Sequence, residues 1–330
     1  MKKVTWLSLA TLLFFSLPVL PCMAKTTWNA NVAWPPNNHH SIGMVQFSEK
    51  IKTLTNGELD IVVQCGGALG YKGPELLKVV RDGLVPISDI FIGGVAGEAK
   101  IFQVTTLPFL IQNMSEAKLL SEIARPYFDK TATKWKQKIL YIAPWPSTGL
   151  WTMKEVQSAA DMKGLKIRTY DKNCAMVVDA AQATPYALPF SEVYSSLATG
   201  LINSVITSTS TAVDGKFWEV LKYYQRLNMT VATNMVTVNL RKFNKLDKKT
   251  QQILIDTGKE MEKIMWKRVA ELDKEKEAVC NGKGIKSVPV SQAFLAELSK
   301  LSDGIHQEWK KNAPADAIKI YNAFLQKVGR

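Results

Sequence analysis

The sequence predicts an α/β protein of two domains, with a ligand cleft between them and a long helix near the C-terminus that spans both. In the first half of the chain, short β-type runs alternate with helical patterns, which is typical of a parallel sheet covered by helices. The 330 residues are enough for two domains of ordinary size. From Asp247 to Cys280 one helical pattern runs almost unbroken. At about 1.5 Å per residue this helix would be roughly 50 Å long, which exceeds the width of one small domain.

The amino-terminal segment has the pattern of an export signal. Lys2 and Lys3 precede an apolar run from Val4 to Leu20, and small residues follow as far as Ala24. A basic start, an apolar middle and a small-residue end are typical of a secretory signal peptide rather than a membrane anchor. We therefore expect residues 1–24 to be removed and the mature protein to be periplasmic.

Composition argues against nucleic-acid, metal and cofactor binding. Hydrophobic residues make up 46% of the chain, as in soluble globular proteins, and the formal net charge is +13. The lysines alternate with glutamates inside predicted helices, which indicates solvated helix faces rather than a nucleic-acid surface. The cysteines that remain after cleavage permit at most one disulfide, and neither they nor the three histidines have metal-ligand spacing. These cysteines are Cys65, Cys174 and Cys280.

Residues 25–148 are expected to form the first α/β domain. Its first helix is predicted to start at Ser41, a good capping residue, and to end at the turn Asn56-Gly57. A longer helix should begin near Ser115. The predicted strands cover residues 28–34, 59–64, 84–92 and 139–145, and a short helix covers 74–82.

A glycine-rich loop, residues 65–74, lies between the second predicted strand and the helix that follows it. Such a loop can bind anions through backbone N–H groups at the start of a helix. Its spacing matches neither the phosphate loop nor the dinucleotide fingerprint. We therefore expect no nucleotide cofactor.

Residues 149–235 are expected to form the second α/β domain, with residues 146–164 as the crossover into it. Ser191 is predicted to cap a helix that ends at Thr199. The other predicted elements are strands at 165–170 and 202–206 and helices at 175–181 and 212–223.

Residues 236–330 are expected to be shared by both domains. A β-rich run over 229–240 should return to the first domain, and the long helix follows it. Two amphipathic helices, near 291–311 and 315–328, should close the chain.

Arg168 is the main candidate for ligand binding. Leu165, Ile167 and Thr169 alternate with polar residues in the period-2 pattern of a half-buried strand. A guanidinium inside such a strand is costly to bury alone. Its partner is either an internal acid or a ligand carboxylate, which matches the planar guanidinium with two parallel hydrogen bonds.

Two segments carry a resemblance to a known family: "DMKGLKIR" at residues 161–168 and "PFSEVYSSLATG" at residues 189–200. Together they resemble the solute-binding proteins of TRAP (tripartite ATP-independent periplasmic) transporters, the dicarboxylate-binding-protein-like family, from about Gly66 to Leu246. The resemblance implies a periplasmic-binding-protein fold with a spanning helix. It also implies that Arg168 binds the carboxylate of a small organic acid, which is delivered to membrane subunits. Some members are dimers, so a monomer and a dimer both stay open.

The remaining candidate residues lie at predicted strand ends, where the ligand crevice of α/β sheets is found. In the family an asparagine assists the strand arginine, and here Thr207 or Ser208 stands at that position. Sialic-acid members carry a second arginine upstream, and residues 147–152 contain none, which argues against sialic acid. A single strong cation suits a monocarboxylate better than a dicarboxylate. The other candidates are Trp34, Asn38, His40, Tyr71, Trp145, Trp151, Tyr170 and Phe190. The aromatic side chains either belong to the core or wall an apolar pocket, for which an aromatic or 2-oxo monocarboxylate is the expected ligand.

Two other functions fit an exported α/β chain. One is an enzyme acting on a small organic acid, for which no G-x-S-x-G or H-E-x-x-H motif is present, so no catalytic residue is expected. The other is a ligand sensor for a membrane kinase. A receptor that binds by hinge closure is the leading prediction.

Overall fold

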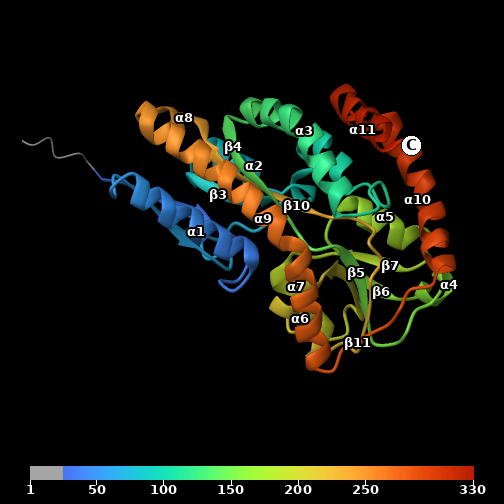
Figure 1. Cartoon of the computed structure of the whole chain (residues 1–330). Coiled ribbons are helices and arrows are strands. Elements are labelled where there is room, and N and C mark those ends of the chain that lie inside the picture. The colour runs from blue at the N-terminus through green and yellow to red at the C-terminus, as the bar shows by residue number, and fades with distance from the viewer. Residues whose placement is uncertain (1–24) are drawn as a thin grey trace, which may run out of the picture.

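The structure is a computed structural model that describes residues 25–330, and the predicted signal peptide lies outside the described residues. Two mixed β-sheets form the centres of two domains (Figure 1). We call the first sheet with its helices domain I and the second sheet with its helices domain II.

The sheet of domain I has the strand order β2-β1-β3-β10-β4. Strand β1 pairs in parallel with β2 and β3, as the β-α-β pattern predicts, whereas β10 runs antiparallel to both β3 and β4. The late strand β10 is central and buried along its whole length, so the chain does return to the first sheet. The bounds are β1 Thr26–Asn31, β2 Leu59–Gln64, β3 Ile87–Phe91, β4 Gln137–Pro144 and β10 Thr233–Asn239.

Helices cover both faces of this sheet and build two apolar cores. In one core Phe102 and Phe128 pack edge to face with ring centroids 4.8 Å apart, and in the other Phe47 packs on Tyr141 at 5.6 Å. The helices are α1 His39–Leu54, α2 Leu76–Asp82, α3 Met114–Lys134 and α8 Leu240–Asn244, with 3₁₀ turns η1 Gly93–Val95 and η2 Lys100–Thr106.

Helix α1 starts two residues earlier than predicted. The cap is Asn38, whose side-chain oxygen accepts a hydrogen bond from the backbone N–H of His40, and not Ser41. The Ser41 hydroxyl instead donates to the Trp34 carbonyl oxygen at 3.1 Å. Both residue types can cap a helix, and only the position of the preceding turn decides between them.

The sheet of domain II has the order β11-β9-β5-β8-β6-β7. Strand β6 is parallel to β7 and β8, whereas β5 is antiparallel to β8 and β9. The strands are β5 Thr148–Thr152, β6 Lys166–Thr169, β7 Thr184–Ala187, β8 Ser204–Ser208, β9 Tyr223–Gln225 and β11 Lys286–Ser287. Its helices are α4 Ala159–Met162, α5 Lys172–Ala180, α6 Phe190–Ala198, α7 Thr209–Asp214 and η3 Phe217–Glu219.

Two predicted elements of domain II were wrong. Strand β5 lies inside the segment that was predicted as a crossover. The strand was missed because Gly149 interrupts the alternation of apolar and polar residues. A Cβ at Gly149 would come within 2.2 Å of the Tyr224 ring, so only glycine fits there. The helix predicted over 212–223 ends at Asp214, because Lys216 adopts a left-handed φ of 49° and β9 follows.

The long helix α9 (Lys248–Gly282, 35 residues) spans both domains, as predicted. It packs on α1 and β4 in domain I and on α7 and β11 in domain II (Figure 1). The terminal helices α10 (Gln292–Asn312) and α11 (Ala315–Val328) form a second connection: α10 packs on α4 and α5, and α11 on α3 and η2.

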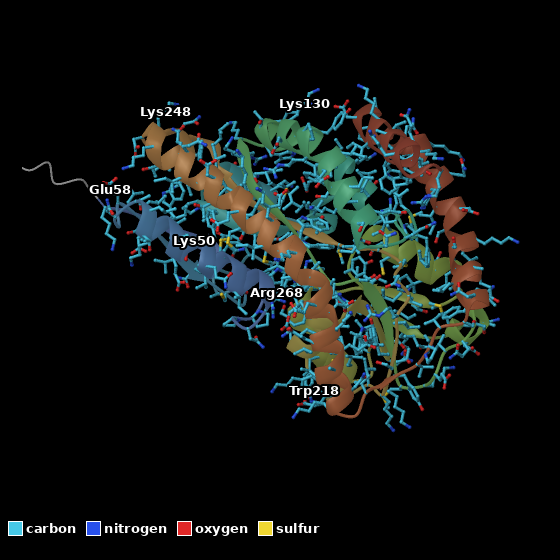
Figure 2. All side chains as sticks on the ribbon, in the orientation of Figure 1. Lys50, Glu58, Lys130, Trp218, Lys248 and Arg268 are labelled. Atoms are coloured by element: carbon cyan, nitrogen blue, oxygen red, sulfur yellow. The ribbon has the colours of Figure 1, made fainter. Side chains whose placement is uncertain are left out.

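Charged side chains lie along the outer faces of the helices (Figure 2). On α9, Arg268 pairs with Glu271 and Glu275, and Lys50 on α1 pairs with Glu260 of α9. This interleaving of charges agrees with the solvated helix faces expected from the sequence. No helix within residues 25–330 is long and apolar enough to cross a membrane, and all three cysteines in this range are free.

Candidate ligand-binding site

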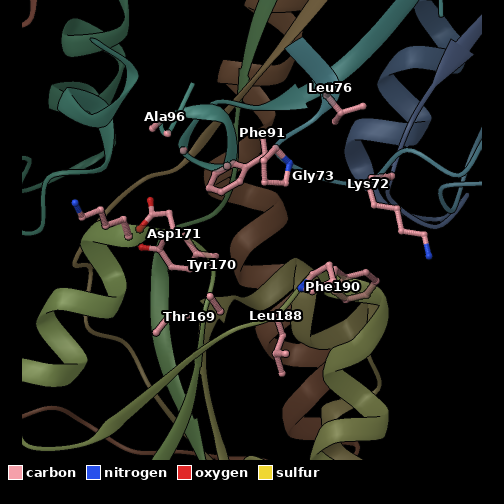
Figure 3. Close-up of a pocket in the computed structure, with 18 of the residues that line it drawn as sticks. Lys72, Gly73, Leu76, Phe91, Ala96, Thr169, Tyr170, Asp171, Leu188 and Phe190 are labelled. Carbon is pink, nitrogen blue, oxygen red and sulfur yellow. The ribbon is translucent and has the colours of Figure 1, made fainter. Parts of the chain in front are cut away.

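A cavity of about 790 Å³ lies between the two sheets (Figure 3). Domain I contributes Trp34, Asp89, Phe91 and the loops at 72–76 and 93–97, and domain II contributes residues 168–173 and 187–190. A smaller cavity of about 50 Å³ shares four of these residues and is also lined by Trp145, Thr207 and Ser208. The shared residues are Trp34, Phe91, Arg168 and Tyr170.

Arg168 lines both cavities from strand β6 and is only 6% exposed. Its Nε donates a hydrogen bond to the carbonyl oxygen of Leu188 at 3.0 Å. No acidic side chain within residues 25–330 forms an ion pair with Arg168, unlike Arg125 and Arg226. Burial lowers its pKa to about 10, so the guanidinium stays charged at neutral pH.

The loop after strand β7 fixes the orientation of the guanidinium. Strand β7 lies parallel to β6 with Tyr186 opposite Arg168, and the chain then passes through Leu188 into α6. Helix α6 begins at Phe190, and its N-cap residue is Pro189, whose side chain makes no capping hydrogen bond. The prediction that Ser191 is the cap was therefore wrong. A bond from Nε to a main-chain oxygen leaves the two terminal nitrogens of Arg168 for another acceptor.

Two tryptophans of domain I form the wall opposite Arg168. Trp34 and Trp145 pack edge to face with centroids 4.7 Å apart. The indole N–H of Trp34 donates to Asp89 Oδ1 at 3.0 Å, and that of Trp145 donates to Asn234 Oδ1 at 2.7 Å. Because both N–H groups already have acceptors, the rings offer apolar surface to a ligand.

The end of strand β8 supplies hydroxyl groups to the smaller cavity. Thr207 and Ser208 both line it, and Ser208 Oγ accepts a bond from the backbone N–H of Thr211 at the start of α7. Thr207 is fixed through its carbonyl oxygen, which accepts from the Trp151 indole N–H at 3.2 Å. The predicted neighbourhood of Arg168, Thr207 and Ser208 is therefore present in the structure.

Two further aromatic candidates lie at the cavity. The Tyr170 hydroxyl is 2.7 Å from Thr230 Oγ1, on the segment that leads from domain II into β10. The Phe190 ring approaches Trp34 across the cleft with centroids 6.0 Å apart. The two adjoining cavities thus bring together seven of the predicted residues: Trp34, Trp145, Arg168, Tyr170, Phe190, Thr207 and Ser208.

Four other candidates line neither cavity. Trp151 is fully buried in the core of domain II, stacked on Tyr224 at 4.2 Å. Tyr71 packs against the core of domain I while its neighbours in the glycine-rich loop face the cleft. Asn38 caps α1, and His40 is buried behind Trp145 at a ring distance of 4.4 Å. A position at a predicted strand end places a residue near the cleft. It does not determine whether the side chain points into the cleft or into the core.

The sequence reasoning missed Asp171 and Phe91. Asp171 lines the larger cavity and caps α5 by accepting from the Cys174 N–H at 2.8 Å. Burial raises the pKa of its carboxyl group to about 6. Phe91, at the end of β3, lies 6.0 Å from the Tyr170 ring. The available signal was that each residue lies within one position of the end of a predicted strand.

Two titratable groups that lie close to the cavity walls have strongly shifted pKa values. Burial raises the pKa of the Cys174 thiol far above neutral, and burial lowers the pKa of His39. Within residues 25–330 no cluster of histidine, cysteine and acidic residues is suited to a metal ion. The arrangement can bind an anion beside an apolar wall.

Two α/β domains joined by a spanning helix, with a cleft between them that contains a buried arginine, define an extracytoplasmic solute receptor. The family model of the bacterial extracellular solute-binding proteins, family 7, matches residues 30–312. The chain therefore belongs to this family, and the resemblance to TRAP solute-binding proteins is confirmed.

Several proteins of known description are similar to this chain. The 2,3-diketo-L-gulonate-binding periplasmic protein YiaO of Escherichia coli (strain K12) is 27% identical over 70% of this chain and 71% of its own length. The Bordetella pertussis receptor DctP7, which binds pyroglutamic acid, has a TM-score of 0.88 at 27% identity and covers 91% of this chain and 99% of its own. A marine-metagenome TRAP protein specific for pyroglutamate has a TM-score of 0.87 at 29% identity, over 92% and 99%.

Proposed function

We propose that this protein is the periplasmic receptor of a TRAP transporter for a small monocarboxylate and that Arg168 binds the carboxylate group. The cleft closes on the ligand between the two domains, and the closed receptor delivers it to the membrane subunits. The ligand we favour is a compact ring acid such as pyroglutamate.

The buried, unpaired charge of Arg168 is the observation that carries this proposal. A charge this deeply buried is costly unless it acquires a partner, and the protein itself supplies only the Leu188 carbonyl oxygen to Nε. A carboxylate accepts both terminal N–H groups in a bidentate pair. The hydroxyls of Thr207 and Ser208 at the smaller cavity can then donate to the same carboxylate.

The cavity walls support a single carboxylate attached to an apolar body. Arg168 is the deeply buried cation of the site, whereas Lys72 and Lys172, which also line the larger cavity, are exposed. Trp34, Trp145 and Phe190 provide flat apolar surface on which a small ring can lie. The two pyroglutamate-binding relatives, both above 25% identity, support this ligand size.

A thermal-shift screen of ligand-stripped protein tests the proposal. The panel contains pyroglutamate, proline, phenylpyruvate, pyruvate, succinate and glucuronate, so that ring, 2-oxo acid, dicarboxylate and uronate compete. A ligand at 100 times its Kd adds about 2.7 kcal/mol of stability, which is readily measured. We expect pyroglutamate to give the largest shift. A largest shift with succinate would contradict the monocarboxylate assignment, and no shift with any acid would contradict the carboxylate receptor.

A further inference from the structure

One hydrogen bond joins the two domains beside the cleft without lining either cavity. Asn38 Nδ2, at the start of α1 in domain I, donates to Asp214 Oδ2, at the end of α7 in domain II, at 2.6 Å. Asn38 is completely buried, and neither residue belongs to the walls of the two cavities. The bond therefore reports the relative position of the domains rather than contact with a ligand.

Asn38 uses both ends of its amide. Its Oδ1 accepts from the His40 backbone N–H at 2.8 Å and caps α1, while its Nδ2 reaches Asp214. Helix α1 has no acidic residue in its own first turn. Asp214 reaches this positive helix end from the other domain, but the cost of burying its charge exceeds that attraction, because the pKa of its carboxyl group is raised to about 6.

Residues of two other helices face Asp214. Asn38 and His40 face it from α1, and Lys276 faces it from α9. Its second oxygen, Oδ1, is buried and has no hydrogen-bond partner within residues 25–330. Helix α7 is itself held on α9 by a 2.7 Å bond from Thr209 Oγ1 to Asp273 Oδ1. The Asn38–Asp214 bond thus ties α1 to a helix that is already anchored on the spanning helix.

Both partners are connected to the ligand walls by short segments of chain. Helix α7 begins next to Ser208 and has only six residues, and Ser208 and Thr211 line the smaller cavity. On the other side Asn38 follows Trp34, and the adjacent His40 ring packs on Trp145 at 4.4 Å. Asn38 and Asp214 thus each lie a short segment away from a cleft wall, in opposite domains.

We propose that Asn38 and Asp214 form an interdomain latch that stabilises the closed receptor and raises ligand affinity without touching the ligand. They are positioning residues: their bond forms on closure and is broken on opening. The inference rests on the proposed function to the extent that ligand binding drives this closure.

Burial raises the pKa of Asp214 to about 6, which adds a pH dependence to the latch. A carboxyl group whose pKa is higher in the closed state than in the open state takes up a proton on closure. Its contribution to closure is complete below its ordinary pKa and is lost as the pH rises through about 6. The latch should therefore hold more strongly at pH 5.5 than at pH 7.5.

The sharpest variant is Asn38→Asp. Aspartate caps a helix as well as asparagine does, so α1 keeps its cap, but a second carboxylate then faces Asp214. Combining Asn38→Asp with Asp214→Asn exchanges donor and acceptor and restores the bond. Asn113→Asp is the matched control, because Asn113 caps α3 through the Glu116 N–H and has no partner in domain II.

Calorimetric titration with pyroglutamate at pH 7.5 gives the first readout. We expect Asn38→Asp to weaken binding by about tenfold or more, the double variant to recover to within about threefold of wild type, and the control to bind like wild type. Wild-type affinity for Asn38→Asp, or a double variant as weak as the single one, would overturn the latch.

Small-angle X-ray scattering with and without saturating pyroglutamate gives a second readout, which reports closure rather than affinity. We expect the radius of gyration of wild type, Asn113→Asp and the double variant to fall on ligand addition, and that of Asn38→Asp to fall less. Equal contraction of Asn38→Asp and wild type would overturn the latch. The absence of both binding and contraction in the wild type would contradict the proposed ligand, and the acid with the largest thermal shift then replaces pyroglutamate in both measurements.

Discussion

The guanidinium of Arg168 is held by one main-chain oxygen: its Nε donates to the Leu188 carbonyl at 3.0 Å across the β6–β7 edge of the second sheet. The loop that follows strand β7 thereby orients a buried cation toward the cleft without forming an ion pair with it. An acid in place of the carbonyl would have made an internal salt bridge. The carbonyl leaves the charge for a ligand.

Replacing Arg168 by methionine should abolish binding while leaving the ligand-free protein at least as stable as wild type. The variant removes a buried charge that has no acidic partner, and apolar replacement of such groups is often neutral or stabilising. Thermal unfolding with and without ligand measures both effects. Arg125→Met is the control: Arg125 pairs with Asp129 and Glu262, so its loss should lower the free energy of unfolding and leave the Kd unchanged. A ligand-free Arg168→Met protein that is clearly less stable than wild type would mean that Arg168 is a structural residue.

Aromatic substitutions should separate binding from stability. Trp145→Phe shortens a ring that lines the smaller cavity and removes its bond to Asn234, so the Kd should rise by about threefold to tenfold. Phe128→Leu shortens a core ring packed on Phe102, so the free energy of unfolding should fall by about 1–3 kcal/mol at constant Kd. Titration and chemical denaturation of both variants test this, and a raised Kd for Phe128→Leu alone would contradict the placement of Trp145 in the binding site.

Gly258 allows α9 to approach the first sheet closely. A Cβ at this position would come within 2.5 Å of the Leu140 carbonyl oxygen, so Gly258→Ala should cost about 1–3 kcal/mol of unfolding free energy. The control is Gly304→Ala in the middle of α10, where nothing lies within 4 Å of the added methyl group. That variant should gain up to about 1 kcal/mol from helix propensity. Equal effects of the two substitutions in denaturant titrations would contradict the close approach of α9.

Asp171 should make the protein less stable as the pH rises. Burial raises the pKa of its carboxyl group to about 6, above the ordinary value of the unfolded chain. The contribution of this group to stability is complete below that ordinary pKa and is lost as the pH rises through about 6. Asp171→Asn keeps the cap on α5, so it should exceed wild type by about 1–2 kcal/mol at pH 7.5. The difference should shrink toward pH 5, and a difference that is constant from pH 5 to pH 8 would exclude titration of Asp171 as its cause.

Periodicity and capping residues sufficed for the long elements of the fold. Helices α9, α10 and α11 each lie within about two residues of their predicted ranges, because apolar residues recur on one face and clear caps begin α9 and α10. Short strands in domain II were harder. Strand β5 contains Gly149, whose fit depends on Tyr224 some 75 residues away in sequence, about which local patterns carry no information.

The charged residue of the candidate site could be predicted from the sequence, whereas the aromatic residues that line its walls could not. Arg168 stood out because a cation inside an apolar alternation needs a partner. Trp145 and Trp151 have similar sequence surroundings, yet one lines a cavity and the other is buried in a core. The antiparallel pairing of β5 with β8 and β9 decides which face Trp151 occupies, and that pairing is a tertiary property. The contact between Asn38 and Asp214 likewise joins residues 176 positions apart.

The most direct test of carboxylate recognition by Arg168 compares an acid with its own amide. The acid that gives the largest thermal shift is titrated calorimetrically into wild type and Arg168→Met beside the corresponding carboxamide, which has the same shape and no charge. We predict that wild type binds the acid at least about 100-fold more tightly than the amide, and that Arg168→Met loses this discrimination. Equal affinity of wild type for acid and amide, or undiminished preference for the acid in Arg168→Met, would contradict the account.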